Sequence, residues 1–215
     1  LLAALGDDGA EQDPARTFLS AHLTQGDRFA TYAAATSVTF DSDRDTDDAG
    51  WRASHACVAA NAAGVLGSAL WPALMASQGA DGSWAAYWWK TDAMSTALAA
   101  AALSQAAPEA AQRAVAWGRD RLTDETLTAF DLAWLVRLLR LGDGDDRAAA
   151  DTAAKRLAAM QLADGSWPAG AQMLFPAPDT LARDPGAAVY LAEYRVFTTA
   201  AALAALSPLC QADTE

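Results

Sequence analysis

A seven-residue phrase occurs twice in this chain, as QGADGSW from Gln78 to Trp84 and as QLADGSW from Gln161 to Trp167. The two copies begin 83 positions apart, which is twice a period of about 41 residues and lies in the range typical of repeat architectures. A degenerate copy is therefore expected between them, near Arg119 to Thr126. A weaker copy is expected upstream at Thr24 to Phe29, with Phe29 in the place of Trp.

Each copy lies between a mixed helical pattern and an Ala-rich apolar one. The apolar runs begin at Ser54, Ala93, Thr128 and Val196, and the mixed runs are ARTFLSAHL, SALWPALMAS, EAAQRAVAW and ADTAAKRLAAM. Ala is the best helix former, and the sequence shows no sustained alternation of apolar and polar residues that would indicate strands. Because a helix that is apolar on every side must be buried, we expect an all-α fold with the apolar helices inside and the mixed helices outside.

Repeated helical hairpins that curve form a toroid or part of one. The runs predict an α/α-toroid of about four to five helical hairpins, as a single domain over residues 1–215. The chain opens with LLAALG, a pattern typical of the end of a helix, so the toroid is expected to be open or truncated at its N-terminal end. Within the phrase we expect Asp-Gly to make a turn, Gln to bond backbone groups at a helix end, and Trp to stack on Gln and fill the joint between hairpins.

The pattern of Gln and Gly-x-Trp, recurring between helices, resembles the QW motif of the squalene–hopene cyclase and class II terpene cyclase superfamily. The resemblance covers the chain from about Pro14 to Leu206 and implies an α/α-toroid.

An acidic run, DSDRDTDD from Asp41 to Asp48, supplies a second point of resemblance. Its last four residues match the DxDD motif of the cyclases that start ring closure by protonation. The resemblance implies that Asp47 donates a proton to an alkene or epoxide, with Asp45 and Asp48 holding its environment. Chemistry agrees with this role, since crowding of carboxylates favours keeping one of them protonated, and a neutral carboxylic acid can act as a general acid.

The substrate is expected to meet aromatic faces, which can stabilise a developing cation, and polar groups at one mouth of the toroid. The candidate substrate-binding residues are Asp43, Trp51, Arg52, His55, Tyr87, Trp88, Trp89, Glu193, Tyr194 and Arg195. Two roles are open for Arg195, which can hold a phosphate or sulfate or pair with Glu193.

The acidic run also has other interpretations. It can be a solvated loop, or it can supply N-caps for the next helix. A third interpretation is a calcium loop, since Asp41, Asp43 and Asp45 match the first ligands of an EF-hand. However, the sixth and twelfth positions of that loop are Thr46 and Arg52 in place of Gly and Glu.

Composition and charge exclude several classes. A net charge of −12 argues against binding to nucleic acids or anionic membranes, and no apolar run reaches the roughly 18 residues of a membrane span. Zinc, which the related prenyltransferase β subunits bind, lacks a convincing ligand set, because His22 and His55 are the two histidines. We therefore expect no metal and no cofactor. Cys57 and Cys210 lack CxxC spacing and no signal peptide is recognisable, which predicts a cytoplasmic protein.

Three functions remain open. The first is a cyclase of bacterial specialised metabolism that acts on a small-molecule intermediate by general acid/base catalysis in the toroid cavity. The second is one subunit of a heteromeric enzyme, with a partner subunit completing the barrel, that closes an aziridine-type ring on a polar amine by displacing sulfate or phosphate. The third is a non-catalytic interaction module, because a fold alone does not choose a function.

Overall fold

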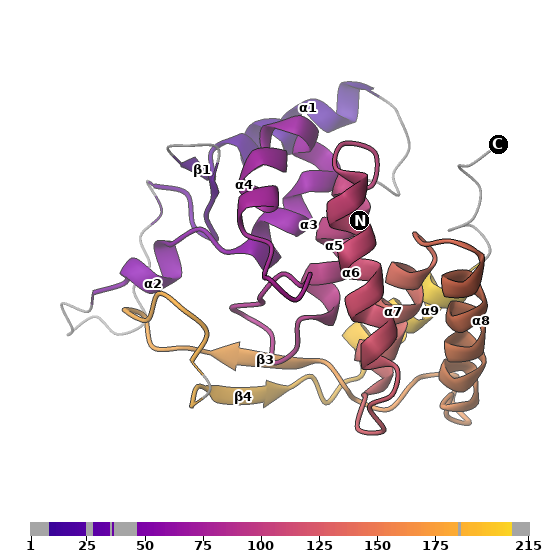
Figure 1. The fold of residues 1–215 in the computed structure, drawn as a ribbon. Coiled ribbons are helices and arrows are strands. Elements are labelled where there is room, and N and C mark those ends of the chain that lie inside the picture. The colour runs from indigo at the N-terminus through magenta and orange to yellow at the C-terminus, as the bar shows by residue number, and fades with distance from the viewer. Residues whose placement is uncertain (1–8, 25–27, 35, 37–46, 185, 208–215) are drawn as a thin grey trace.

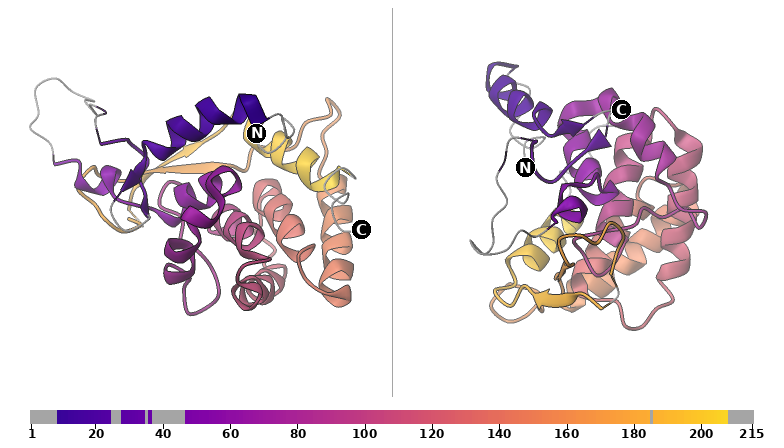
Figure 2. Two further views of the ribbon diagram at one scale, coloured as in Figure 1. Left: turned by 90° about the horizontal axis from the view of Figure 1, so that it is seen from above. Right: turned by 90° about the vertical axis from the view of Figure 1, so that its left-hand side faces the viewer.

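The computed structural model describes residues 9–24, 28–34, 36, 47–184 and 186–207, and in this part most of the chain is helical (Figure 1). Four helices form a curved inner row, in which each packs against the next: α3 (Ala56–Leu66), α5 (Ala93–Leu103), α7 (Ala129–Leu139) and α9 (Val196–Leu206). Three helices cover the convex side of this row: α4 (Trp71–Ala76), α6 (Pro108–Arg121) and α8 (Gly144–Ala159) (Figure 2). The predicted all-α fold of the α/α-toroid type is confirmed.

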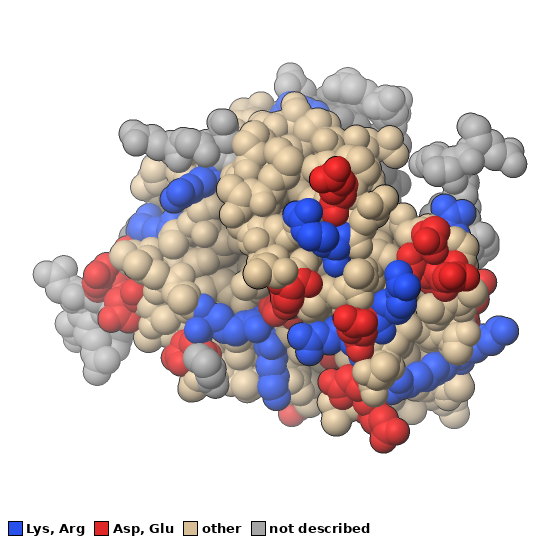
Figure 3. All heavy atoms as spheres, in the orientation of Figure 1, with Lys and Arg blue, Asp and Glu red and all other residues tan. Residues whose placement is uncertain are grey.

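The inner row consists of the four apolar runs that the sequence predicts for it. The helices α3, α5 and α9 contain no charged residue, and α7 contains Asp131 and Arg137. Small alanines such as Ala99 and Ala100 are fully buried, so neighbouring helices can approach closely. The convex layer instead carries charged side chains of both signs over α6 and α8, as expected of amphipathic helices that face water (Figure 3).

The first mixed run departs from the prediction. It forms α1 (Gly9–Ser20), which packs against α3 from the concave side of the row and is not part of the convex layer (Figure 2). The upstream copy of the phrase also differs, because β1 (Leu23–Thr24) and β2 (Arg28–Phe29) pair there as a short antiparallel ladder. Phe29 is nevertheless buried in the core, which is the environment expected for a Trp equivalent.

Both copies of the phrase fold in the same way, with a polar turn in front of the Trp. Asp81 accepts a hydrogen bond from the Ser83 amide at 3.0 Å, and Asp164 accepts one from the Ser166 amide at 3.0 Å. Hydrogen bonds from the Ser83 amide and hydroxyl lower the pKa of Asp81, and hydrogen bonds from the Ser166 hydroxyl and amide lower the pKa of Asp164. The intervening Gly82 has a φ of 93°, a conformation that favours glycine. Asp124 and Thr126 repeat the carboxylate–amide bond at 2.8 Å, so the expected degenerate copy is present.

The Trp indoles bond a helix end, a role that we expect of Gln from the sequence, while Gln78 also donates to Ala110 O in the first turn of α6 at 2.8 Å. Gln78 and Gln161 each donate to the carbonyl of the glycine in their own turn, at 2.9 Å, and therefore close the loop. The indole N–H of Trp84 donates to Leu74 O and that of Trp167 to Leu157 O, both at 2.7 Å. These carbonyls lie in the last turns of α4 and α8, where each also accepts the C-cap amide, from Ser77 and Met160 respectively, at 3.1 Å. The buried Trp residues therefore cap the outer helices.

The backbone amides of the same two Trp residues tie each outer helix to the next inner helix. The amide of Trp84 donates to Thr96 at 3.0 Å and the amide of Trp167 donates to Thr199 at 3.3 Å. Each threonine is the fourth residue of its inner helix. The repeat thus fixes three elements together: the end of one helix, the turn, and the start of the next helix.

A second hairpin was not expected from the sequence. The strands β3 (Gln172–Phe175) and β4 (Ala188–Leu191) pair antiparallel, and β4 is exposed along its whole length. Met173 forms a bridge to Trp89, so the hairpin lies against the loop that leads into α5 (Figure 1). The remaining short elements are α2 (Ala49–Arg52) and the 3-10 turn η2 (Gly67–Ala69). In the portion of the chain described, no helix has the length and hydropathy needed to cross a bilayer.

Candidate functional site

The loop from Tyr87 to Trp89 joins the N-terminal ends of the inner helices. Tyr87 stacks on His55, the N-cap of α3, with 3.6 Å between ring centroids. Trp89 stacks on Phe130 in the first turn of α7 at 5.3 Å and meets Phe197 in the first turn of α9 at 5.9 Å. This end of the inner row is therefore lined with aromatic rings.

The structure brings four of the candidate aromatic and histidine side chains into one cluster. Trp88 lies 6.0 Å from Trp51 and 4.9 Å from Tyr87 between ring centroids, and His55 stacks on Tyr87. The polar edges are used by the protein, because Trp51 Nε1 donates to Pro176 O at 3.0 Å. Similarly, the Tyr87 hydroxyl donates to Thr180 O at 2.7 Å. Trp51, His55 and Tyr87 are thus buried and fixed in place, and Trp88 is the partly exposed ring of the cluster.

Two titratable groups of this cluster stay neutral at physiological pH. Burial lowers the pKa of His55, and its Nε2 lies 2.8 Å from Gly50 O, which requires that this nitrogen carry the proton. Burial and the Asp179 carboxylate raise the pKa of Tyr87 to about 12. Both side chains therefore position the loop and α2, with His55 linking α2 to the start of α3.

The described part of the acidic run leads directly into α2. Asp47 is exposed, and its Oδ1 accepts the Ala49 amide at 3.0 Å. Asp48 forms an ion pair with Arg52 at 2.7 Å, and Arg52 also donates to Thr36 O at 2.9 Å. Arg52, expected to bind the substrate, thus holds the acidic segment to α2. Asp43 and Asp45 lie outside the described residues, as does Asp41 of the calcium interpretation.

The position of α2 is fixed by a loop far away in the sequence. The Trp51 amide donates to Pro178 O at 3.1 Å, and a side chain on Gly50 would place its Cβ 2.1 Å from Thr180 O. Because that distance is shorter than any real carbon–oxygen contact, this position requires glycine. The last residue before α2, Asp48, is therefore held by the aromatic cluster on one side and by residues 176–180 on the other.

The three candidate substrate-binding residues before α9 do not gather as the sequence predicts; they are Glu193, Tyr194 and Arg195. Arg195 pairs with Asp164 at 3.2 Å and not with Glu193, because its backbone adopts the left-handed region (φ 61°) as the N-cap of α9. Tyr194 is 90% exposed and Glu193 is also exposed. The structure therefore does not bring Glu193 and Tyr194 into the aromatic cluster.

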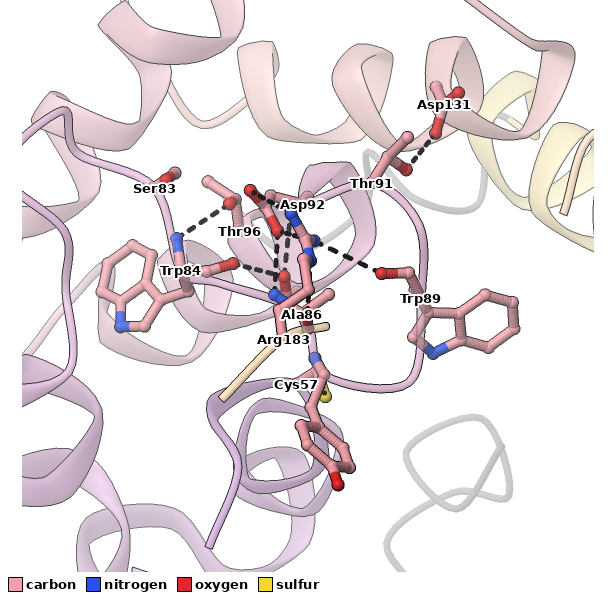
Figure 4. Close-up of polar contacts among 12 residues, drawn as sticks. Cys57, Ser83, Trp84, Ala86, Trp89, Thr91, Asp92, Thr96, Asp131 and Arg183 are labelled. Atoms are coloured by element: carbon pink, nitrogen blue, oxygen red, sulfur yellow. Dashed lines mark hydrogen bonds and ion pairs between the residues drawn. The ribbon is translucent and has the colours of Figure 1, made fainter. Parts of the chain in front are cut away.

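One polar centre was missed by the sequence analysis. Arg183 forms an ion pair with Asp92 and donates to Ala86 O at 2.9 Å and Trp89 O at 3.3 Å (Figure 4). Asp92 in turn accepts the Ala86 amide at 2.8 Å. This network clamps the aromatic loop to the start of α5. An Asp before an apolar run indicates a helix start, but nothing in the sequence links it to Arg183, 91 positions later.

Metal-binding side chains do not gather in the described part of the chain, where no group of three or more His, Cys, Asp or Glu could hold an ion. Cys57 is a buried thiol whose pKa is raised by burial. The arrangement therefore offers an acidic segment, a set of apolar aromatic faces and neutral positioning groups.

Comparison with known proteins places this geometry in context. No family model and no curated protein sequence matches the chain. Among solved structures, a variant of the type II terpene cyclase MstE from Scytonema, in complex with its product merosterolic acid A, superposes with a TM-score of 0.84. The two chains are 26% identical, over 94% of this chain and 68% of that one. Another MstE variant, in complex with its substrate geranylgeranyl dihydroxybenzoate, gives a TM-score of 0.83 and 27% identity over 94% and 69%.

A more distant structure agrees in fold alone. The ent-copalyl diphosphate synthase from Streptomyces platensis is 20% identical, with a TM-score of 0.55 over 86% of this chain and 36% of that one. The superposition agrees with the sequence resemblance to class II cyclases. The chain has a class II terpene cyclase-like fold.

Proposed function

We propose that this chain closes rings in a prenylated small molecule and that Asp47 starts the reaction by protonating an alkene. The observation that carries the proposal is the superposition on MstE over 94% of the chain, including complexes of that cyclase with a geranylgeranyl substrate and its cyclic product. Such a reaction has a place in bacterial specialised metabolism, as the sequence predicts.

The acidic segment is suited to this role because its support is rigid. Asp47 and Asp48 come directly before α2, and α2 is pinned through Trp51 and Gly50 to residues 176–180. A general acid must be held within hydrogen-bond reach of the atom that it protonates. In this proposal Asp48 and Arg52 hold the segment, Asp45 completes its electrostatic environment, and Asp47 presents the proton.

The aromatic faces suit the second part of the reaction. Protonation of the terminal alkene forms a carbon–hydrogen bond and leaves a tertiary cation, which the remaining alkenes attack in turn to form the rings. Trp88 and Trp89, which are partly exposed, can stabilise this charge, since a cation over an aromatic face gains about 0.5–2 kcal/mol. Loss of a proton from the last cation ends the sequence, so the product is an isomer of the substrate and no cofactor is consumed.

The test is the substitution Asp47→Asn, which keeps the shape and removes the acid. With geranylgeranyl dihydroxybenzoate as the probe, turnover is expected to fall by about 10²–10⁴-fold while the substrate still binds. Asp145→Asn, on the exposed start of α8, is the matched control and should react like the wild type.

Two outcomes would contradict the proposal. Wild-type turnover in Asp47→Asn, with unchanged melting, would leave the acidic run as a solvated loop. A loss confined to the Michaelis constant and weakened by salt would instead favour attraction of a cationic amine, the second function considered from the sequence.

We also propose that a partner subunit covers the exposed side of α9. Val196 and Leu203, on one side of this helix, are 66% and 55% exposed, although the helix belongs to the apolar inner row. Light scattering of the purified natural gene product measures its assembly. A fully active monomer of this chain alone would contradict the proposal.

A further inference from the structure

The segment of residues 176–183 holds two parts of the molecule that are far apart in the sequence. Near its start, two of its carbonyls accept from the indole and the amide of Trp51 at 3.0 and 3.1 Å, and so fix α2. Its last residue, Arg183, bonds the loop that carries Trp88 and Trp89. One short stretch therefore places the acidic segment before α2 and the aromatic rings relative to each other.

The Arg183 guanidinium bonds both the aromatic loop and the helix that the loop enters (Figure 4). Its Nε donates to Ala86 O at 2.9 Å, and one terminal nitrogen donates to Trp89 O at 3.3 Å. The two terminal nitrogens also reach the two carboxylate oxygens of Asp92, the N-cap of α5. The side chains of Arg183 and Asp92 are 29% and 23% exposed. A forked pair that is partly shielded from water in this way fixes the orientation of both partners.

The same contacts occupy the carbonyls of the aromatic loop. Ala86 O and Trp89 O accept from Arg183, and Trp88 O accepts from the Leu174 amide at 2.9 Å. A carbonyl oxygen without a donor attracts positive charge and can take a proton from a carbocation. Loss of the guanidinium would leave Ala86 O and Trp89 O without this donor, in the loop whose rings are proposed to stabilise the cation.

We propose that Arg183 is a positioning residue for ring closure, which fixes the aromatic loop relative to the acidic segment and keeps the loop carbonyls occupied. This assignment rests on the proposed function. Arg183 does not contact the reacting atoms in this account, because Asp92 and the loop use its donors. It acts on the steps that follow protonation, where a displaced ring stabilises the cation less well.

The chemical consequence of losing Arg183 is early termination. A cation that is poorly stabilised loses a proton from a neighbouring carbon, to a freed carbonyl or to water, before the next alkene attacks it. The carbon–hydrogen bond breaks and its electron pair forms an alkene. The product is still an isomer of the substrate, with one carbon–carbon double bond more for each ring that has not closed.

The test measures the ratio of fully to partly cyclised products by chromatography and mass spectrometry, with geranylgeranyl dihydroxybenzoate as the probe. Arg183→Gln should lower this ratio by about 10-fold or more and change the Michaelis constant by less than about threefold. Arg183→Lys keeps the charge but lacks the planar fork, so it should restore part of the ratio. Asp92→Asn should shift the products in the same direction. The double variant should add little to the larger single shift, because both residues act through one contact.

The matched control is Arg119→Gln, which removes another Arg–Asp pair at a helix start. Arg119 pairs with Asp146 at 2.7 Å on the convex layer, and this variant should keep the wild-type product ratio whatever its melting temperature. An unchanged ratio in Arg183→Gln would overturn the proposal, and so would an equal loss of all products, which would assign Arg183 to stability alone. If Arg183→Gln does not fold, Asp92→Asn decides by the same criteria. In each case, cyclisation that depends on Asp47 would leave the proposed function standing.

Discussion

The Trp167→Ala substitution tests the structural role of the repeated phrase. Trp167 is 2% exposed, packs in the core between α7, α8 and α9, and caps Leu157 O at 2.7 Å. Truncating a buried Trp to Ala costs about 3–5 kcal/mol, because packing is lost and a cavity remains. For a chain of this size about 1 kcal/mol corresponds to roughly 2–4 °C, so the melting temperature should fall by about 6–20 °C.

Two further variants distinguish the loss of packing from the loss of the helix cap and provide an exposed control. Trp167→Phe keeps most of the apolar area and removes the cap, so we expect a loss of about 1–2 kcal/mol. Tyr194→Ala removes an aromatic ring that is 90% exposed, and its stability should change by less than about 0.5 kcal/mol. The assay is urea unfolding followed by far-ultraviolet circular dichroism. If Trp167→Ala unfolded like the wild type but lost activity, the reasoning would be refuted and Trp167 would belong to the active site.

Other predictions follow from single contacts. Gly50→Ala should destabilise the fold by about 1–3 kcal/mol in thermal melting, since its Cβ would meet Thr180 O. Gly64→Ala lies in a helix with open space around the added Cβ and should stabilise the fold by about 0.5–1 kcal/mol. If both glycine variants melt alike, the tight contact at Gly50 is absent. Because burial lowers the pKa of His55 below its usual 6.5, the unfolded chain binds more protons as pH falls through this value, and stability is lost on acidification. His55→Gln should flatten this part of the stability curve against pH; an unchanged curve would show that His55 does not carry the effect.

Much of the fold could be predicted from the sequence because its signals are local. The apolar runs identify the inner helices, since a helix without a polar side has to be buried. The repeated Asp-Gly turn marks the joints between hairpins. The hairpin of β3 and β4 gave no such signal, because β4 is exposed on both faces and therefore shows no alternation.

The candidate site was less predictable because it depends on contacts between distant segments. The cluster of Trp51, His55, Tyr87 and Trp88 could be assembled in part, since aromatic residues gather near the phrases. The loop of residues 176–180 and Arg183 could not, because their partners are backbone carbonyls and an Asp far away in the sequence. For Arg195 the sequence leaves two roles open, a phosphate or sulfate ligand and a pair with Glu193, because the left-handed backbone that turns it toward Asp164 is not visible in the sequence.

The central claim is that this protein starts ring closure by donating a proton to carbon. Incubation of the purified enzyme with geranylgeranyl dihydroxybenzoate in D₂O tests it most directly, because the initiating proton stays in the product on a carbon that does not exchange. The account predicts a cyclic isomer that carries one deuterium on the ring methylene formed from the CH carbon of the terminal alkene, and no such product from Asp47→Asn. A cyclic product without deuterium, or an equally labelled product from Asp47→Asn at the wild-type rate, would contradict it.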